Sequence, residues 1–172
     1  EMEKIATKEL TKQEKHINKL ERILATQERT IEDYEKRRSD AQERGDAIFE
    51  HYQLVDNLLK TLYSAVKNLG WDEVAVRMGR GDAKLKELLT SMDPKTGRIV
   101  VSLSGSHVEL DITKSINDNA QDYYAKAKKF KHKLEGAAKA VELSKAKLET
   151  ARTEEAPVAE VTKRVQKKRK WY

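Results

Sequence analysis

"DITKSINDNAQDYYAKAKKFKHKLEG", residues 111–136, is the most informative stretch of the chain because it contains the start of a long amphipathic helix. The Ser115 hydroxyl can accept a hydrogen bond from the backbone N–H of Asp118, and the Asp118 carboxylate stands in the first turn, where the helix dipole favours negative charge. An apolar seam then continues in steps of three and four residues to position 155. The segment therefore predicts one arm of a helical hairpin over residues 119–156.

A second seam of the same period occupies residues 10–69. Fourteen of its eighteen positions are apolar or aromatic, which predicts a helix from near the start of the chain to Gly70, with a bend at Gly45. We assign residues 1–44 to the first arm. Pairing the arms antiparallel sets Ile17 opposite Leu148 and Gln13 opposite Ala151. The coiled-coil seam residues that this register selects are Ile17, Leu24, Ile31, Tyr34, Tyr123, Phe130, Leu134, Val141 and Leu148.

Residues 45–118, between the arms, are predicted to form a small knob. Its predicted parts are a helix over 45–69, short helices over 71–79 and 82–92 with Asp82 as the second N-cap, and a β-hairpin over 98–112 that turns at "SGS". Pro157 is expected to end the second arm or start a new helix, and 157–172 form a basic lead-in to a further domain. The expected fold is mainly α: a long antiparallel two-helix coiled-coil stalk with a small α+β knob at its tip.

Composition agrees with an elongated helical protein. Of 172 residues, 38% are hydrophobic and 37% charged, with both signs interspersed and a net charge of +6, so a large compact core is not expected. With no cysteine and four widely spaced histidines, we expect no metal site and no cofactor. We find no nucleophile triad and no phosphate-binding glycine loop, so we expect a binding protein and not an enzyme. No signal segment or apolar membrane span is evident, and the chain opens on Glu1, so we expect a cytoplasmic, monomeric fragment with no membrane partner.

The lysines of the quoted stretch admit two interpretations. They surround the helix in every direction except the seam, and in the predicted register they face the acidic residues of "TIEDYEKR". They could therefore form ion pairs between the arms, each contributing about 0.3–0.5 kcal/mol. Alternatively, they form a positive band that attracts phosphate regardless of sequence. The candidate RNA- or ribosome-binding residues are Lys126, Lys128, Lys129, Lys131 and Lys133, together with the C-terminal Lys167, Lys168, Arg169 and Lys170.

The order of these segments resembles the middle region of the NFACT family, which comprises nuclear export mediator factor, RqcH and fibronectin-binding protein A-like proteins. The resemblance is most specific in "VELDITKSINDNAQDYYAKAKKFKHKLEGA" and extends to "DAIFEHYQLVDNLL", "GWDEV" and the terminal "KKRKWY". The form of "DITKSINDNAQDYY" resembles the archaeal and eukaryotic members, and we expect an archaeal source. The residues that carry the resemblance are Leu110, Asp111, Ser115, Asn119, Ala120, Tyr123, Tyr124, Lys128 and Lys129, with Ile48, Tyr52 and Val55 on the first arm.

The resemblance implies the coiled-coil arm of a ribosome-associated quality-control factor. Such an arm would bind the large ribosomal subunit near the stalk base, through rRNA and a stalk-base protein, and support mRNA-independent tailing of stalled nascent chains. Transfer RNA would be handled by domains outside this sequence, and a ubiquitin ligase is a further expected partner in eukaryotic relatives.

Two alternatives belong to other functional classes. One is a structural coiled-coil spacer whose lysines have no ligand. The other is an extracellular matrix-binding adhesin, suggested by the older family label and by "RGD" at residues 80–82, although a tripeptide often arises by chance.

Overall fold

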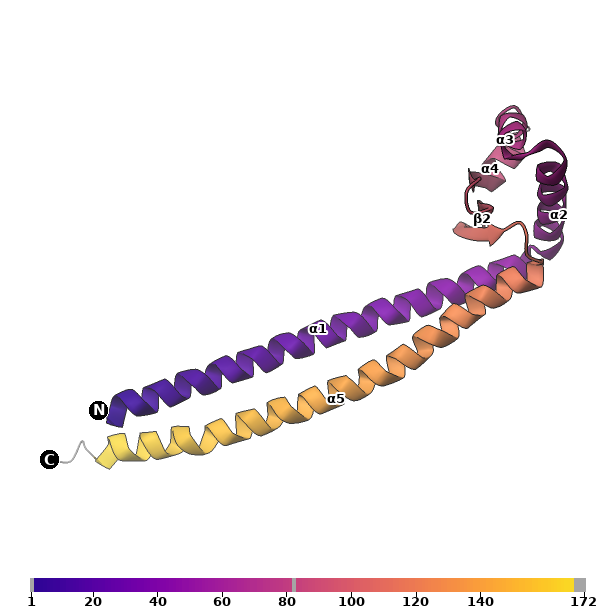
Figure 1. Cartoon of the computed structure of the whole chain (residues 1–172). Helices are drawn as coiled ribbons and strands as arrows, with labels where there is room; N and C mark the ends of the chain where they lie inside the picture. The colour runs from indigo at the N-terminus through magenta and orange to yellow at the C-terminus, as the bar shows by residue number, and fades with distance from the viewer. Residues whose placement is uncertain (1, 82, 169–172) are drawn as a thin grey trace. The chain divides into compact units, whose positions relative to one another are not determined.

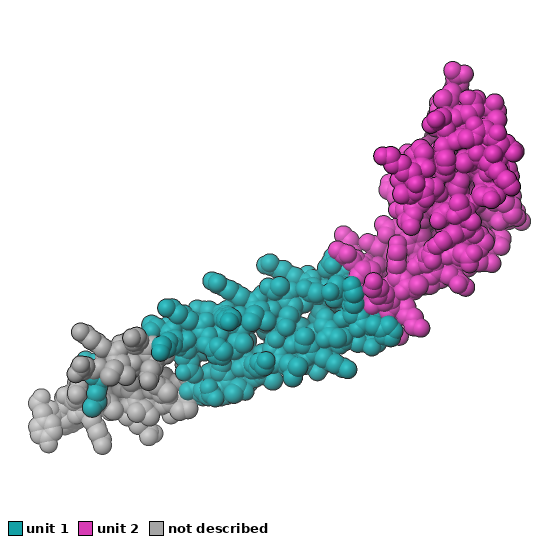
Figure 2. All heavy atoms as spheres, viewed as in Figure 1, with its two compact units in different colours: residues 1–35, 132–172 teal, residues 36–131 magenta. Residues whose placement is uncertain are grey.

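The computed structural model describes residues 2–81 and 83–168, and the side chains of residues 2–3, 11–81, 83 and 86–154. The chain divides into two compact units (Figure 2). Unit 1 comprises residues 1–35 and 132–172, and unit 2 comprises residues 36–131. This division lies at 35/36 and 131/132, and the predicted domain boundaries at 44/45 and 118/119 stay a prediction.

Unit 1 is an antiparallel pair of helices (Figure 1). It contains the first part of α1 (Met2–Glu50) and the later part of α5 (Ile116–Lys168). Its buried cluster consists of Ile17, Leu20, Leu148 and Ala151, with Leu24 packed against it. The side-chain amide of Gln13 also donates to the Ala151 carbonyl at 3.4 Å. Ile17 and Leu148, and likewise Gln13 and Ala151, are therefore neighbours in the predicted register.

The first helix does not continue unbroken to Gly70, and the bend expected at Gly45 stays a prediction. α1 continues through Gly45 to Glu50, and α2 (Tyr52–Leu69) begins after His51. Because Gly45 has no side chain, the Tyr124 ring can lie close to the backbone of α1. A Cβ at this position would lie 2.8 Å from Cε1 of Tyr124. The interruption at His51 also removes Tyr52 from the seam and leaves it 42% exposed.

The prediction that Pro157 ends the second arm is also wrong. α5 runs from Ile116 to Lys168 without interruption. A proline inside a helix removes one backbone hydrogen bond and costs about 3 kcal/mol, and a helix of 53 residues retains enough other bonds to continue past it. The predicted start of α5 is confirmed, since the Asp118 N–H donates to Ser115 Oγ at 3.1 Å.

Unit 2 contains a three-stranded antiparallel sheet in the order β1-β2-β3. After α3 (Trp71–Gly79) and α4 (Ala83–Leu88), the chain forms β1 (Leu89–Asp93), β2 (Arg98–Leu103) and β3 (Ser106–Asp111). The predicted hairpin is present as β2 and β3, and its turn at Ser104 and Gly105 has positive φ angles of 49° and 78°, as a two-residue primed turn requires.

The prediction of a helix over 82–92 is wrong in its second half, because Leu89–Asp93 pairs with β2. Asp93 explains the change of direction. Its carboxylate accepts from the Lys95 N–H at 3.0 Å and from the Thr96 hydroxyl at 2.8 Å. This turn folds "DPKTG" back as a hairpin, so pairing with β2 outweighs the helical tendency of the leucines before it. The predicted N-cap, Asp82, lies outside the described residues.

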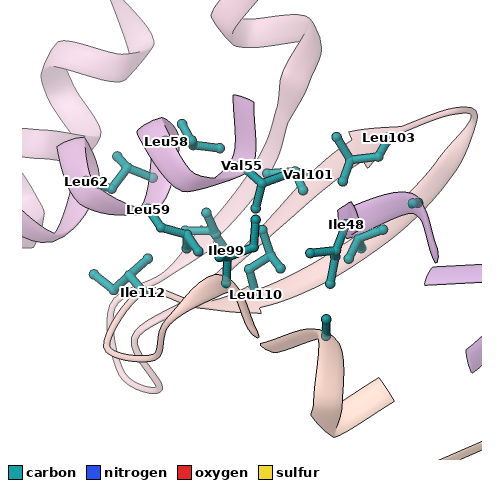
Figure 3. Packing of buried hydrophobic residues seen from close by; sticks show 14 of the residues in the cluster. Ile48, Val55, Leu58, Leu59, Leu62, Ile99, Val101, Leu103, Leu110 and Ile112 are labelled. Carbon is teal, nitrogen blue, oxygen red and sulfur yellow. The ribbon is translucent and has the colours of Figure 1, made fainter. Parts of the chain in front are cut away.

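The core of unit 2 forms where one face of the sheet packs on α2 and on the parts of α1 and α5 in this unit. Figure 3 shows Val55 and Leu59 of α2 beside Val101 and Ile99 of β2. Leu62 is 3% exposed and belongs to the same cluster. The predicted fold class is confirmed: the protein is mainly α, with a long antiparallel two-helix element and a small α+β unit. The buried residues of this core are Ala47, Ile48, Val55, Leu58, Leu59, Leu62, Val74, Ile99, Val101, Leu103, Val108, Leu110, Ile112, Ile116, Ala120 and Tyr123.

Candidate nucleic-acid interface

The rotation of α5 in unit 2 is fixed by hydrogen bonds to the edge strand β3. The Tyr123 hydroxyl accepts from the Glu109 N–H at 2.9 Å and donates to the Glu109 carbonyl at 2.7 Å. Asn119 makes the same pair of bonds two residues farther along the strand. Its side-chain amide accepts from the Asp111 N–H at 2.8 Å and donates to the Asp111 carbonyl at 3.0 Å. Since an edge strand presents unpaired backbone groups, these two side chains take the place of a neighbouring strand.

Arg44 of α1 extends this arrangement by donating from Nε to the His107 carbonyl at 3.1 Å. Alternate residues of β3 are therefore each bonded to a side chain from α1 or α5. No pattern in the sequence predicts these bonds, because Arg44, Asn119 and Tyr123 are ordinary helix residues until the strand is placed beside them.

With its rotation fixed, α5 sorts its lysines onto two flanks. Tyr123 and Ala127 face the core and are 7% and 6% exposed. Each residue turns a helix by about 100°, so Lys126 and Lys129 follow one side of the core face, and Lys128 and Lys131 follow the other. All four lysines are exposed.

On the first flank, Lys126 and Lys129 border a hollow of about 290 Å³ beside the end of β3. The other residues that line it are Arg98, Glu109, Leu110, Asp111, Asn119, Asp122, Tyr123 and Ala125. The Lys126 ammonium lies 5.3 Å from the centre of the Tyr123 ring, within the range of a cation–π interaction.

The carboxylates of this hollow are occupied by other groups. Glu109 pairs with Arg98 at 2.7 Å, and Asp122 pairs with Lys114 at 2.7 Å. Asp111 accepts from the Thr113 hydroxyl at 2.6 Å and from its N–H at 2.9 Å. Although partial burial acts in the opposite direction, these hydrogen bonds lower the pKa of Asp111, so the carboxylate stays ionised. Within unit 2, no described carboxylate lies within 4 Å of Lys126 or Lys129.

On the second flank, Lys128 and Lys131 follow Tyr124 along the helix. The Tyr124 ring lies against Gly45, and its hydroxyl donates to Asp46 Oδ1 at 2.7 Å. Burial, followed by this bond to a carboxylate, raises the pKa of Tyr124 to about 12. Lys128 and Lys131 likewise have no carboxylate within 4 Å among the described residues of unit 2. The predicted pairing of the lysines with Glu32, Asp33 and Glu35 would join residues of the two units and stays a prediction.

The remaining candidate residues lie apart from these four. Lys133 belongs to unit 1, where its ammonium lies 5.4 Å from the centre of the Tyr34 ring. Lys167 and Lys168 end α5, but their side chains are outside the described set, as are Arg169 and Lys170 entirely. Arg37, which the sequence patterns did not select, lies 5.9 Å over the Phe130 ring in unit 2.

A membrane-spanning helix or a metal site would place the protein in a different functional class. Over the described ranges, none of the helices is both long enough and apolar enough to cross a membrane. In that same set of residues, histidine and carboxylate side chains do not gather in any group of three that could hold a metal ion.

Comparison with known proteins gives two matches. The family model described as NFACT N-terminal and middle domains matches residues 2–170. The archaeal Rqc2 homolog aRqcH of Methanocaldococcus jannaschii is 31% identical over 130 residues, which cover 70% of this chain and 19% of that protein. The chain thus spans about a fifth of the length of this curated relative.

Proposed function

The chain belongs to the NFACT family, and from this we propose that it is the coiled-coil middle module of a ribosome-associated quality-control factor. Its relative in Methanocaldococcus jannaschii is named as an archaeal Rqc2 homolog, which supports a role in ribosome quality control. The module binds the large ribosomal subunit near the stalk base and so supports mRNA-independent tailing of stalled chains. Transfer RNA handling belongs to other parts of the whole protein, which acts in the cytoplasm.

The observation that carries this proposal is the set of four exposed lysines on α5 in unit 2, which have no carboxylate within 4 Å among the described residues there, while Glu109 and Asp122 are paired with other cations. Unpaired ammonium groups attract phosphate oxygens, and such contacts position a protein on RNA without reading its sequence. RNA helices are recognised largely by shape and by backbone contacts. A rigid helix with lysines on two flanks therefore suits binding to rRNA.

The module works by binding and not by catalysis. The exposed Ser104 hydroxyl bonds to His51 Nε2 at 2.9 Å and to Glu50 at 3.3 Å, and these contacts join the β2–β3 turn to the junction of α1 and α2. The chemistry of tailing would be performed by the ribosome and by the other domains of the factor.

A triple substitution of Lys128, Lys129 and Lys131 to Gln in the whole factor tests the proposal by cosedimentation with large subunits at several salt concentrations. We expect weaker association and a log–log salt dependence that is shallower by about 0.7–0.9 for each phosphate contact that the substitutions remove. The control is a triple change of Lys67, Lys86 and Lys95 to Gln, which removes equal charge from exposed positions elsewhere in unit 2.

Equal affinity and equal salt slope for the two triple variants would instead favour a structural spacer. In that case the lysines are a solvated surface, and ribosome contact must come from other elements of the protein.

A further inference from the structure

Three aromatic side chains in unit 2 form a nearly parallel series. Phe49 and Tyr124 have ring centres 6.1 Å apart and planes inclined by 13°. Phe49 and Tyr52 have ring centres 6.5 Å apart and planes inclined by 8°. Phe49 is 44% exposed and Tyr52 is 42% exposed. Two large rings thus remain open to solvent beside a core that buries their sequence neighbours Ile48 and Val55.

Two features hold the series in place. Tyr124 is seated on Gly45 and bonded to Asp46, so its ring is fixed. The interruption at His51 separates Phe49, at the end of α1, from Tyr52, at the start of α2. The two exposed rings therefore come from different helices, yet their planes are almost parallel to each other and to the fixed ring.

Two lysines continue the aromatic series along α5. Residues four and seven positions apart share one face of a helix, so Lys128 and Lys131 continue the line of Tyr124, about 6 Å and 10 Å farther along the axis. Three carboxylates near the rings accept hydrogen bonds, and that of Asp56 is also paired with a cation. Asp46 accepts from Tyr124, Asp56 pairs with Lys60 at 2.6 Å, and Glu50 accepts from the Ser104 hydroxyl at 3.3 Å.

We propose that this aromatic series is a stacking platform for an unpaired RNA base, with Lys128 and Lys131 contacting phosphates of the same strand. Base stacking on aromatic rings tolerates any sequence because every base has a π face, and it commonly accompanies a cationic path along the backbone. The inference rests on the proposed function and narrows it. This flank of α5 binds single-stranded RNA, and not only the phosphate backbone of an RNA duplex.

The test uses the 172-residue chain and a fluorescein-labelled oligouridine at low salt, where electrostatic binding is strengthened, with fluorescence anisotropy as the readout. Changing Phe49 and Tyr52 together to Ala should weaken binding by about 5- to 100-fold, the usual effect of losing one base–aromatic stack. The salt slope should stay unchanged, because no cation is removed. Binding to an RNA duplex should change little, since its bases are already stacked.

Two further variants distinguish ring stacking from a general loss of apolar surface. Tyr63→Ala removes an exposed tyrosine elsewhere in unit 2, 46% exposed, and should bind like the parent chain. Phe49→Leu keeps apolar bulk but removes the planar ring, so it should also weaken binding to oligouridine. Hydrogen exchange in unit 2 would verify that each variant remains folded.

Parent-like affinity of the Phe49/Tyr52 variant would overturn the inference, as would full binding by Phe49→Leu, which would indicate an apolar surface for a protein segment. No binding of oligouridine by the parent chain at low salt would overturn it too. If the Lys128/Lys129/Lys131 variant still loses affinity for the ribosome while the aromatic variant binds RNA normally, only this inference fails and the proposed function stands.

Discussion

The two units stabilise their helices in different ways. The buried cluster of unit 2 has sixteen residues, drawn from helices and from the sheet. Among the described side chains of unit 1, which leave out residues 4–10 and 155–168, the buried cluster has four members, all on two helices. Because apolar burial contributes about 25 cal/mol per Å², the larger source of stability among the described residues lies in unit 2. Unit 2 is also the unit in which β3 fixes the rotation of α5 and hence the direction of the lysines.

Buried polar groups show the same difference. In unit 2, Asn119 is 3% exposed and its amide bonds to both backbone groups of Asp111. In unit 1, the side-chain oxygen of Gln27 is buried and has no hydrogen-bond partner among the described atoms. A satisfied polar group specifies one arrangement, whereas an unsatisfied one only costs energy. The buried amide of Asn119 therefore specifies how α5 is placed on β3.

The largest effect should come from a charge placed in the core of unit 2. Leu62→Asp should destabilise that unit by about 3–5 kcal/mol, through the loss of packing and the burial of a carboxyl without a partner. In hydrogen exchange measured by mass spectrometry, protection should be lost across the sheet and α2 while residues 11–30 keep theirs. Leu54→Asp is the control, because Leu54 is on the same helix and 46% exposed. Equal loss of protection in both units would mean that they unfold together and that the contrast between them is wrong.

A smaller effect is expected from removing the amide that bonds to β3. Asn119→Ala should cost about 2 kcal/mol, because the Asp111 N–H and carbonyl lose their partners. The midpoint of urea unfolding, followed by circular dichroism, measures this loss. Asn117→Ala, at an exposed position two residues earlier, should have little effect. Similar midpoints for the two variants would show that the amide does not hold α5 on the strand.

The smallest effects, of opposite sign, should come from one helical glycine in each unit. Gly136→Ala should stabilise by about 0.5–1 kcal/mol, since alanine favours helix and a Cβ there meets no atom within 4 Å. Gly45→Ala should destabilise by about 1 kcal/mol, because its Cβ must displace the Tyr124 ring. In a Tyr124→Ala background the Gly45 change should become stabilising. If Gly45→Ala stabilised the parent chain as well, the close approach would not constrain α1.

The elements that the sequence predicted are those that depend on local periodicity. The seam residues Ile17, Leu148 and Tyr123 are all buried, and the cap at Ser115 forms as its residue types require. Elements decided by distant partners were missed. Leu89–Asp93 became a strand only because β2 lies beside it, and Gly45 is a contact site only because Tyr124 rests on it.

The candidate site shows the same limit. The lysines could be selected by composition, but their separation into two flanks depends on how α5 is rotated. That rotation is set by Asn119 and Tyr123 through backbone groups of β3, and side-chain bonds to a strand edge have no periodic signature in the sequence. Phe49 was missed because its exposure depends on the interruption at His51.

Site-specific photo-crosslinking in the whole factor can establish whether the flanks of α5 contact rRNA. A photoreactive amino acid would replace Lys129 on one flank, Lys128 on the other, and the exposed Val76 of α3 as a reference position, 49% exposed. After irradiation on large subunits, we expect rRNA crosslinks from positions 128 and 129 and far fewer from position 76. Crosslinks confined to ribosomal proteins, or equal rRNA yields from all three positions, would contradict rRNA binding by the flanks of α5.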